Sequence, residues 1–282
     1  MQKVSKKKDL DRDIINLKEA GKTIGFVPTM GALHEGHLSL IKECKNQCDI
    51  SIVSIYVNPT QFNDKADFTN YPRDIDSDIR KIESIGGVDI VYTPISEELY
   101  PDDSLLDFDL GYYDTIMEGA NRPGHFRGVL TIVDKLFNIV KPDFAFFGEK
   151  DYQQLAIISH MSKLLHKGTK IVACPTLREA SGLAMSSRNE LLSTEQRIEA
   201  ANIYKSLKSA INKVDSFKSV KELKDYVIGE VDNFKTLKTE YFEIADKDSL
   251  EAAKSLDSVS SLRAFIAVRC GNVRLIDNIP FN

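Results

Sequence analysis

The sequence predicts an α/β protein with a parallel sheet, followed by a smaller α+β domain. Over residues 1–175, short apolar runs of strand length alternate with amphipathic stretches, which is typical of a sheet with helices on its faces. After Pro175-Thr176 the order changes, because helical stripes come first and strand-like runs come last. We therefore predict two domains, 1–175 and 176–282. A chain of 282 residues is long enough for each domain to bury a hydrophobic core of its own.

The first strand–helix–strand unit is expected to start near residue 23, after an amphipathic helix over 9–20. Thr23–Val27 and Ile50–Val57 are apolar runs, and the residues between them repeat apolar side chains at helical spacing. A unit of roughly thirty residues suits one βαβ crossover, which joins parallel strands.

The later elements follow from the same patterns. Strands are expected over 88–92, 143–147, 169–174, 241–245, 262–269 and 273–276, the last two joined as a hairpin at Gly271-Asn272. Helices are expected after Asp74, over 129–140 and 155–165, and after the capping boxes Ser193-x-x-Gln196 and Ser219-x-x-Glu222. Residues 95–127 have a weak pattern, which indicates a functional loop or a missed element.

The composition excludes several classes of protein. A net charge of −5 and a pI near 5.6 argue against a nucleic-acid partner, which requires a basic face. No apolar run has the length of a membrane span, and the N-terminus lacks the apolar segment of a signal peptide, so we expect no membrane partner and a cytoplasmic location. The four cysteines form no Cys-x-x-Cys pair, so free thiols are expected.

The loop at residues 30–37 is the strongest candidate site. It stands between a predicted strand and a helix start, where free backbone N–H groups and the helix dipole bind anions. The loop consists of Met30, Gly31, Ala32, Leu33, His34, Glu35, Gly36 and His37. Its histidines could be neutral or cationic, and they could equally be capping or surface residues; a zinc site lacks further ligands at a recognisable spacing.

Three more segments carry candidate binding groups. Gln61, in the turn 58–63, offers donors and an acceptor to a hydroxylated carboxylic acid. In Gly148-Glu149-Lys150-Asp151, the lysine can reach a phosphate and the aspartate a ribose hydroxyl or a metal, with Gln154 at the same sheet edge. The small, hydroxylated loop 181–189 carries Arg188 and suits an anion. Each alone could also be a solvated loop or a surface ion pair.

Six segments, in order along the chain, resemble the pantothenate synthetase (pantoate–β-alanine ligase) family. They are Pro28–His37, Asn58–Phe62, Arg122–Phe126, Gly148–Asp151, Gly182–Asn189 and Arg274–Asn278. The resemblance implies a Rossmann-like nucleotidyltransferase domain, a C-terminal lid and a homodimer. It also implies an ATP- and Mg²⁺-dependent condensation of (R)-pantoate with β-alanine through a pantoyl-adenylate, releasing AMP and pyrophosphate.

The same resemblance implies roles for the candidate residues. Met30 to His37 would bind ATP, with His37 as proton donor or charge stabiliser at the α-phosphate and His34 beside it. Lys150 and Arg188 would complete the catalytic set. Gln61 and Gln154 would bind pantoate, and β-alanine would arrive near Gln61. The remaining ATP contacts would come from Gly148, Glu149, Lys150, Asp151, Leu177, Met185, Ser186, Ser187 and Arg188, with Mg²⁺ entering with ATP and no protein ligand assigned.

One position departs from the family pattern. Many members have an aspartate before Gly182, whereas this chain has Ser181, which can cap the turn but carries no charge. Two other readings remain open from the sequence: another adenylyl- or cytidylyltransferase, and a non-catalytic nucleotide-binding regulator. The amide pair Gln61 and Gln154 argues against the first, and the retained His37, Lys150 and Arg188 argue against the second.

Overall fold

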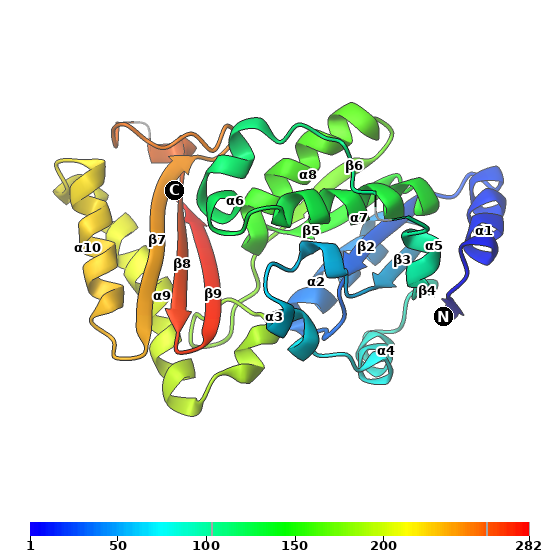
Figure 1. Ribbon diagram of the computed structural model, residues 1–282, viewed down its shortest axis with the longest axis horizontal. Coiled ribbons are helices and arrows are strands. Elements are labelled where there is room, and N and C mark those ends of the chain that lie inside the picture. The colour runs from blue at the N-terminus through cyan, green and yellow to red at the C-terminus, as the bar shows by residue number, and fades with distance from the viewer. Residues whose placement is uncertain (103, 258, 282) are drawn as a thin grey trace. The chain divides into compact units, whose positions relative to one another are not determined.

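The computed structural model describes residues 1–102, 104–257 and 259–281. The chain forms two compact units (Figure 1). The first contains residues 1–149 and 153–175, and the second contains residues 150–152 and 176–282. The short segment Lys150–Tyr152 therefore groups with the C-terminal residues, although it lies within the N-terminal part of the sequence.

The first unit contains a six-stranded, fully parallel sheet. Its order is β1-β4-β3-β2-β5-β6, with β1 Gln2–Val4, β2 Ile24–Thr29, β3 Ile50–Ile55, β4 Ile90–Tyr92, β5 Phe144–Gly148 and β6 Lys170–Cys174. The predicted parallel sheet is confirmed. Strand β1 was not predicted, because three residues with two polar side chains form no apolar run.

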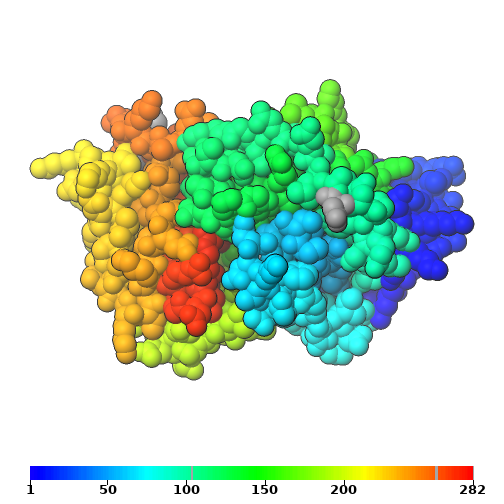
Figure 2. All heavy atoms as spheres, in the orientation of Figure 1, coloured from blue at the N-terminus to red at the C-terminus, as the bar shows by residue number. Residues whose placement is uncertain are grey.

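Helices connect these strands. They are α1 Lys7–Glu19, α2 Glu35–Gln47, α3 Lys65–Asn70, α4 Ile75–Ser84, α5 Ser96–Leu99, α6 Met117–Asn121, α7 His125–Val140 and α8 Tyr152–Leu165, with 3₁₀ turns η1 Pro59–Gln61, η2 Gly111–Thr115 and η3 Glu149–Asp151. The weakly patterned run 95–127 therefore contains short helices, and α7 begins before the apolar stripe at 129. Figure 2 shows residues 65–84, in light blue and cyan, at the surface of the first unit.

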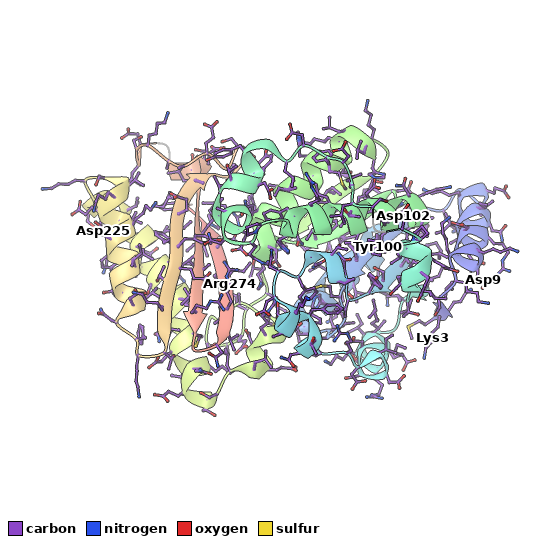
Figure 3. All side chains as sticks on the ribbon, in the orientation of Figure 1. Lys3, Asp9, Tyr100, Asp102, Asp225 and Arg274 are labelled. Carbon is purple, nitrogen blue, oxygen red and sulfur yellow. The ribbon has the colours of Figure 1, made fainter. Side chains whose placement is uncertain are left out.

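The central strands of this sheet are covered on both faces. Phe26, Val27, Ile52, Val53 and Phe146 are completely buried, as expected for the near-continuous apolar strands of a parallel sheet. Charged side chains lie on outer helix faces, such as Asp9 on α1 of the first unit and Asp225 on α10 of the second (Figure 3).

The second unit is a three-stranded antiparallel sheet with two long helices. The sheet order is β7-β8-β9, with β7 Leu237–Asp246, β8 Leu262–Cys270 and β9 Val273–Pro280, and the predicted turn at Gly271-Asn272 is confirmed. The helices are α9 Thr194–Asn212 and α10 Val220–Asp232, and the 3₁₀ turns are η4 Ser187–Leu191, η5 Val214–Ser216 and η6 Val259–Ser261. The predicted α+β character of this part is confirmed.

The two capping predictions have different outcomes. Ser193 and Gln196 form the complete reciprocal box at the start of α9. Ser219 accepts from the Glu222 N–H at 3.1 Å, but the Glu222 carboxylate accepts from the N–H of Lys218 rather than from that of Ser219. The second helix is therefore capped by Ser219, with the glutamate reaching one residue further back.

Two composition-based expectations can be compared with the described residues. Cys44, Cys48, Cys174 and Cys270 are free cysteines. Within residues 1–102, 104–257 and 259–281, no helix is both long and apolar enough to cross a membrane.

Candidate active site

The candidate residues of the first unit follow three adjacent strands. In the order β3-β2-β5, the turn with Gln61 follows β3, the histidine loop follows β2, and Gln154 comes shortly after β5. Strands β3, β4 and β1 lie on one side of β2, and β5 and β6 lie on the other. The chain runs from β2 outward to β3 and β4 and then returns to place β5 on the other side of β2, so the direction of winding reverses between β2 and β5. Such a reversal at the carboxyl ends of parallel strands is the usual ligand position in open α/β sheets.

The histidine loop is folded around internal hydrogen bonds. Gly31 and Ala32 have φ angles of 81° and 50°, so two consecutive residues adopt the left-handed conformation. Their turn directs the Ala32 and Leu33 N–H groups at the carboxylate of Asp78, at 2.9 and 2.7 Å. The sequence predicted free backbone N–H groups here, and this detail was wrong for Ala32 and Leu33, because a helix far along the chain supplies their acceptor.

Asp78 supplies the carboxylate that accepts the hydrogen bonds of this loop. It belongs to α4, where it is buried next to the apolar residues Ile79 and Ile82, and only 2% of it is exposed. Burial raises the pKa of Asp78 above its usual value, and the hydrogen bonds from Leu33 and Ala32 oppose this rise. Lys81 of the same helix donates to the Leu33 carbonyl at 2.6 Å, so α4 holds the loop through two side chains.

The histidines cap the start of α2. His34 Nδ1 accepts from the Gly36 N–H at 3.1 Å, and His37 Nδ1 accepts from the His34 N–H at 3.3 Å. In both contacts the ring nitrogen Nδ1 is the hydrogen-bond acceptor. Both side chains therefore cap the helix start, which is one of the alternatives that the sequence left open.

Gln61 is held by two neighbours. The Asn58 side chain donates to the Gln61 amide oxygen at 3.0 Å, and the Gln61 amide nitrogen lies 3.0 Å from the sulfur of Met30. Asn58 is 1% exposed, and its own oxygen accepts from Tyr100 at 2.7 Å. Burial raises the pKa of Tyr100 to about 12, so the phenol remains a donor at neutral pH. The candidate residues Gln61 and Met30 are thus in direct contact, on loops that follow neighbouring strands.

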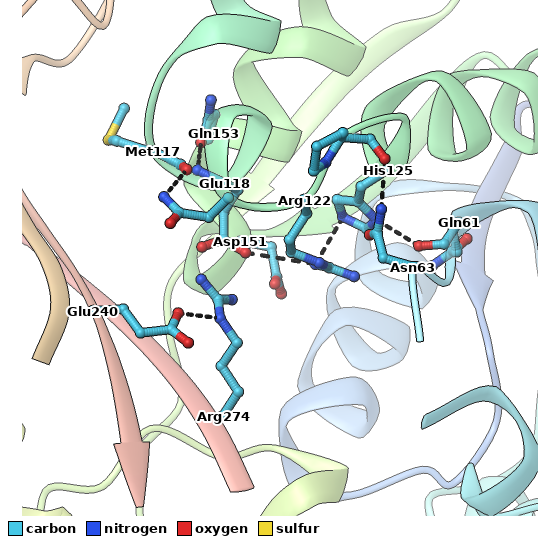
Figure 4. Close-up of polar contacts among 12 residues, drawn as sticks. Gln61, Asn63, Met117, Glu118, Arg122, His125, Asp151, Gln153, Glu240 and Arg274 are labelled. Atoms are coloured by element: carbon cyan, nitrogen blue, oxygen red, sulfur yellow. Dashed lines mark hydrogen bonds and ion pairs between the residues drawn. The ribbon is translucent and has the colours of Figure 1, made fainter. Parts of the chain in front are cut away.

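Helix α7 lies directly against the Gln61 turn. A Cβ on Gly128 would lie 2.3 Å from the Thr60 carbonyl oxygen, so only glycine permits this approach. His125 Nδ1 donates to the Gln61 carbonyl at 2.8 Å, and Arg122 donates to His125 Nε2 at 3.0 Å (Figure 4). The motif Arg122–Phe126 therefore supports the backbone of the Gln61 turn through His125.

The two glutamines at the start of α8 differ in their environments. Gln153 is buried and accepts from the Glu118 N–H at 2.9 Å (Figure 4). Its amide nitrogen donates to the carbonyls of Tyr113 and Ile116. Gln154 is half-buried, and in the described part of the chain its amide has no hydrogen-bond partner. Gln153 is therefore structural, whereas no described residue satisfies the side-chain amide of Gln154.

The remaining candidates belong to the second unit, except Gly148 and Glu149, which end β5 and begin η3. Lys150 is mostly buried and lies 3.6 Å from the more exposed Asp151 carboxylate. The segment after Thr176 doubles back, with Arg178 opposite Ala184 and the Met185 N–H donating to the Leu177 carbonyl at 3.0 Å. Ser186 then caps η4, which contains Ser187 and Arg188.

Several of these supporting residues were not predicted. Asp78 interrupts the apolar face of an amphipathic helix, which was the available signal in the sequence. Gly128, within the α7 stripe, was a second signal, because glycine is unfavourable inside a helix unless something approaches closely. Among the described residues, no three His, Cys, Asp or Glu side chains gather as a metal site.

The fold is that of an α/β protein with a Rossmann-like parallel sheet, and the candidate residues of the first unit lie at its switch point, where such sheets usually bind ligands. The family model described as Pantoate-beta-alanine ligase matches residues 2–280. The chain belongs to this family.

Individual relatives agree with this assignment. The pantothenate synthetase of Flavobacterium psychrophilum is 49% identical over 259 residues, which cover 92% of each chain. The crystal structure of the Thermus thermophilus pantothenate synthetase is 35% identical, with a TM-score of 0.91 over 100% of this chain and 99% of the other. That of the Francisella tularensis pantoate-beta-alanine ligase, complexed with beta-gamma ATP and beta-alanine, is 38% identical, with a TM-score of 0.82 over 100% and 98%.

Proposed function

We propose that this protein condenses (R)-pantoate with β-alanine in an ATP-dependent reaction, through a pantoyl-adenylate, and releases AMP and pyrophosphate. The observation that carries the proposal is the family match over residues 2–280, together with family motifs at the carboxyl ends of β2, β3 and β5. The ATP and β-alanine named for the Francisella structure support the choice of substrates.

The first step would be attack of the pantoate carboxylate on the α-phosphorus of ATP. The bond between the α-phosphorus and the bridging oxygen breaks, and pyrophosphate leaves. The product, the pantoyl-adenylate, is an acyl phosphate. Both reactants are anions, so the protein must hold them together and compensate the developing charge. We assign this role to the imidazoles of His34 and His37 and to the cations Lys150 and Arg188, while Mg²⁺ would enter with ATP and neutralise phosphate charge when bound.

The second step would be attack of the β-alanine amine on the pantoyl carbonyl carbon, with AMP as the leaving group. We assign Gln61 and Gln154 to the pantoate and place β-alanine near Gln61. The Gln154 amide, which has no partner among the described residues, suits a substrate hydroxyl. Neither step needs a covalent enzyme intermediate, so Ser186 and Ser187 act as hydrogen-bond donors.

The other ATP contacts remain part of this proposal. We assign them to the loop Met30–His37, to Gly148–Asp151 with Asp151 near the ribose, to Leu177 and to Met185–Arg188. The proposal includes domains at 1–175 and 176–282 with a C-terminal lid, a homodimer and a cytoplasmic location. Because the N–H groups of Ala32 and Leu33 donate to Asp78, these two residues would contribute to ATP binding through loop shape rather than through free amides.

The test is a complete product balance. The purified protein with pantoate, β-alanine, ATP and Mg²⁺ should form pantothenate, AMP and pyrophosphate in equal amounts. Omission of any one substrate should stop steady-state formation of all three, and without β-alanine at most one pyrophosphate per enzyme should appear. Formation of ADP and phosphate would contradict an adenylate route. Product formation with another acid in place of pantoate would indicate a different adenylyltransferase, and no turnover at all would indicate a regulator.

A further inference from the structure

Strand β9 contains two adjacent buried polar residues, Asp277 and Asn278, which are 6% and 3% exposed. They end the motif Arg274–Asn278, to which the proposed function assigns no role. Consecutive residues of a strand point to opposite faces of the sheet, so the two side chains can hold different segments of the second unit. Their contacts fit this expectation.

Asp277 holds the segment that leads to Arg188. Arg178 donates to the two Asp277 oxygens at 2.6 and 2.8 Å, and its guanidinium lies 3.8 Å from the centre of the Tyr204 ring. Arg178 also donates to the Gly182 carbonyl at 3.2 Å, which closes the turn before Met185. A bidentate, largely buried pair of this kind fixes both position and orientation. The hairpin that carries Met185–Arg188 is therefore anchored at its base to β9.

Asn278 holds the backbone of Lys150. Its Nδ2 donates to the Lys150 carbonyl at 2.8 Å, and its Oδ1 accepts from the buried Arg263. Arg263 in turn lies over the Tyr152 ring at 3.8 Å. The segment Lys150–Tyr152 is thus bound to β8 and β9 at both of its ends, which explains why it groups with the C-terminal residues.

We propose that Asp277 and Asn278 are positioning residues that set Lys150 and Arg188 in fixed places by anchoring their segments to adjacent residues of one strand. The inference rests on the proposed function, in which these two cations act on the phosphates of ATP. Preorganised charges are effective only when they stand where the charge develops, and a displacement of about 1 Å can lower the rate on the order of 10²-fold. Neither Asp277 nor Asn278 needs to touch the substrate.

The central variant is Asn278→Asp, which keeps the shape and the acceptor for Arg263 but removes the donor to the Lys150 carbonyl. We expect kcat to fall about tenfold to a hundredfold, with the KM for pantoate within about twofold of its wild-type value. The unfolding midpoint should fall, because a buried hydrogen bond is lost, while the protein stays folded at the assay temperature. In a Lys150→Ala background, Asn278→Asp should cause no further loss of turnover, because its effect acts through Lys150. Asn202→Asp makes the same chemical change at a residue whose amide donates, within the described residues, only to carbonyls of its own helix α9, and it should leave all kinetic constants unchanged.

Asp277→Asn tests the other anchor and should be non-additive with Arg188→Ala in the same way. Wild-type kcat in Asn278→Asp, or losses that multiply fully in the Lys150→Ala background, would overturn the positioning role. If Asp277→Asn does not fold, the Asn278 series still decides the question. The unsubstituted protein is assayed first: without pantothenate formation the proposed function itself fails, whereas an active wild type with an unaffected Asn278→Asp defeats only this inference.

Discussion

Gly128→Ala is a direct test of how helix α7 supports the Gln61 turn. The added Cβ would lie 2.3 Å from the Thr60 carbonyl oxygen, 2.5 Å from its carbon and 2.7 Å from the Gln61 nitrogen. Ordinary contact begins near 3.4 Å, so the turn and the helix must separate by about 1 Å. All three atoms belong to the backbone, so no side-chain rotation can relieve the clash. The hydrogen bond from Asn58 to the Gly128 carbonyl, 3.2 Å long, would also be strained.

We expect two separate effects of this substitution. Overpacking should lower the free energy of unfolding by about 1–3 kcal/mol, measured by urea denaturation. Displacement of Gln61 by about 1 Å should lower kcat/KM for pantoate and β-alanine by up to about 10²-fold in steady-state assays.

The matched control is Gly229→Ala, on an exposed face of α10. A Cβ there meets no atom within 4 Å, so alanine should stabilise the helix by about 0.5–1 kcal/mol and leave the kinetics unchanged. A Gly128→Ala protein with wild-type stability and wild-type kcat/KM would refute the close approach on which this reasoning depends.

Three further predictions each concern a single side chain. Asp78→Ala leaves the buried N–H groups of Ala32 and Leu33 without their acceptor, and it should lower the free energy of unfolding by on the order of 3 kcal/mol in urea; an unchanged midpoint would contradict the role of Asp78. Gln154→Ala should weaken pantoate binding by ~1–3 kcal/mol in calorimetric titrations and leave ATP binding unchanged, whereas equal losses would indicate general damage. Burial raises the pKa of Glu240, but the hydrogen bonds from Arg274 and Arg269 outweigh burial and hold this pKa below the usual glutamate value of 4.5. The Glu240 carboxylate therefore stabilises the fold above pH 4.5, and this stabilisation is lost as the pH falls through the lower pKa of the folded state. Glu240→Gln should therefore flatten the acid limb of the stability profile, and identical acid limbs would exclude this contribution.

The sheet and the position of the candidate site were predictable because their signals are local. Apolar runs between glycine and proline residues define the strands, and strand-to-helix junctions place Met30–His37 at one sheet edge. The start of α9 was predictable for the same reason, since Ser193 and Gln196 are neighbours in sequence. Local rules therefore gave the correct architecture.

The supporting contacts were not predictable, because each joins residues far apart in the sequence. Asp78 meets Ala32 and Leu33 only after α4 packs beside the loop, and Gly128 meets Thr60 only after α7 crosses the turn. Periodicity reports which face of an element is buried but not which partner covers it. The capping contacts of the histidines likewise depended on which N–H groups face their rings.

Pyrophosphate exchange tests the central claim, the pantoyl-adenylate intermediate, most directly. With pantoate and Mg²⁺ present and β-alanine absent, the enzyme should transfer label from pyrophosphate into ATP, because the first step is complete and reversible before the amine arrives. Arg188→Ala should slow this exchange, since its cation acts on that half-reaction in our proposal. Exchange that proceeds equally well without pantoate, or that appears only when β-alanine is added, would contradict the account.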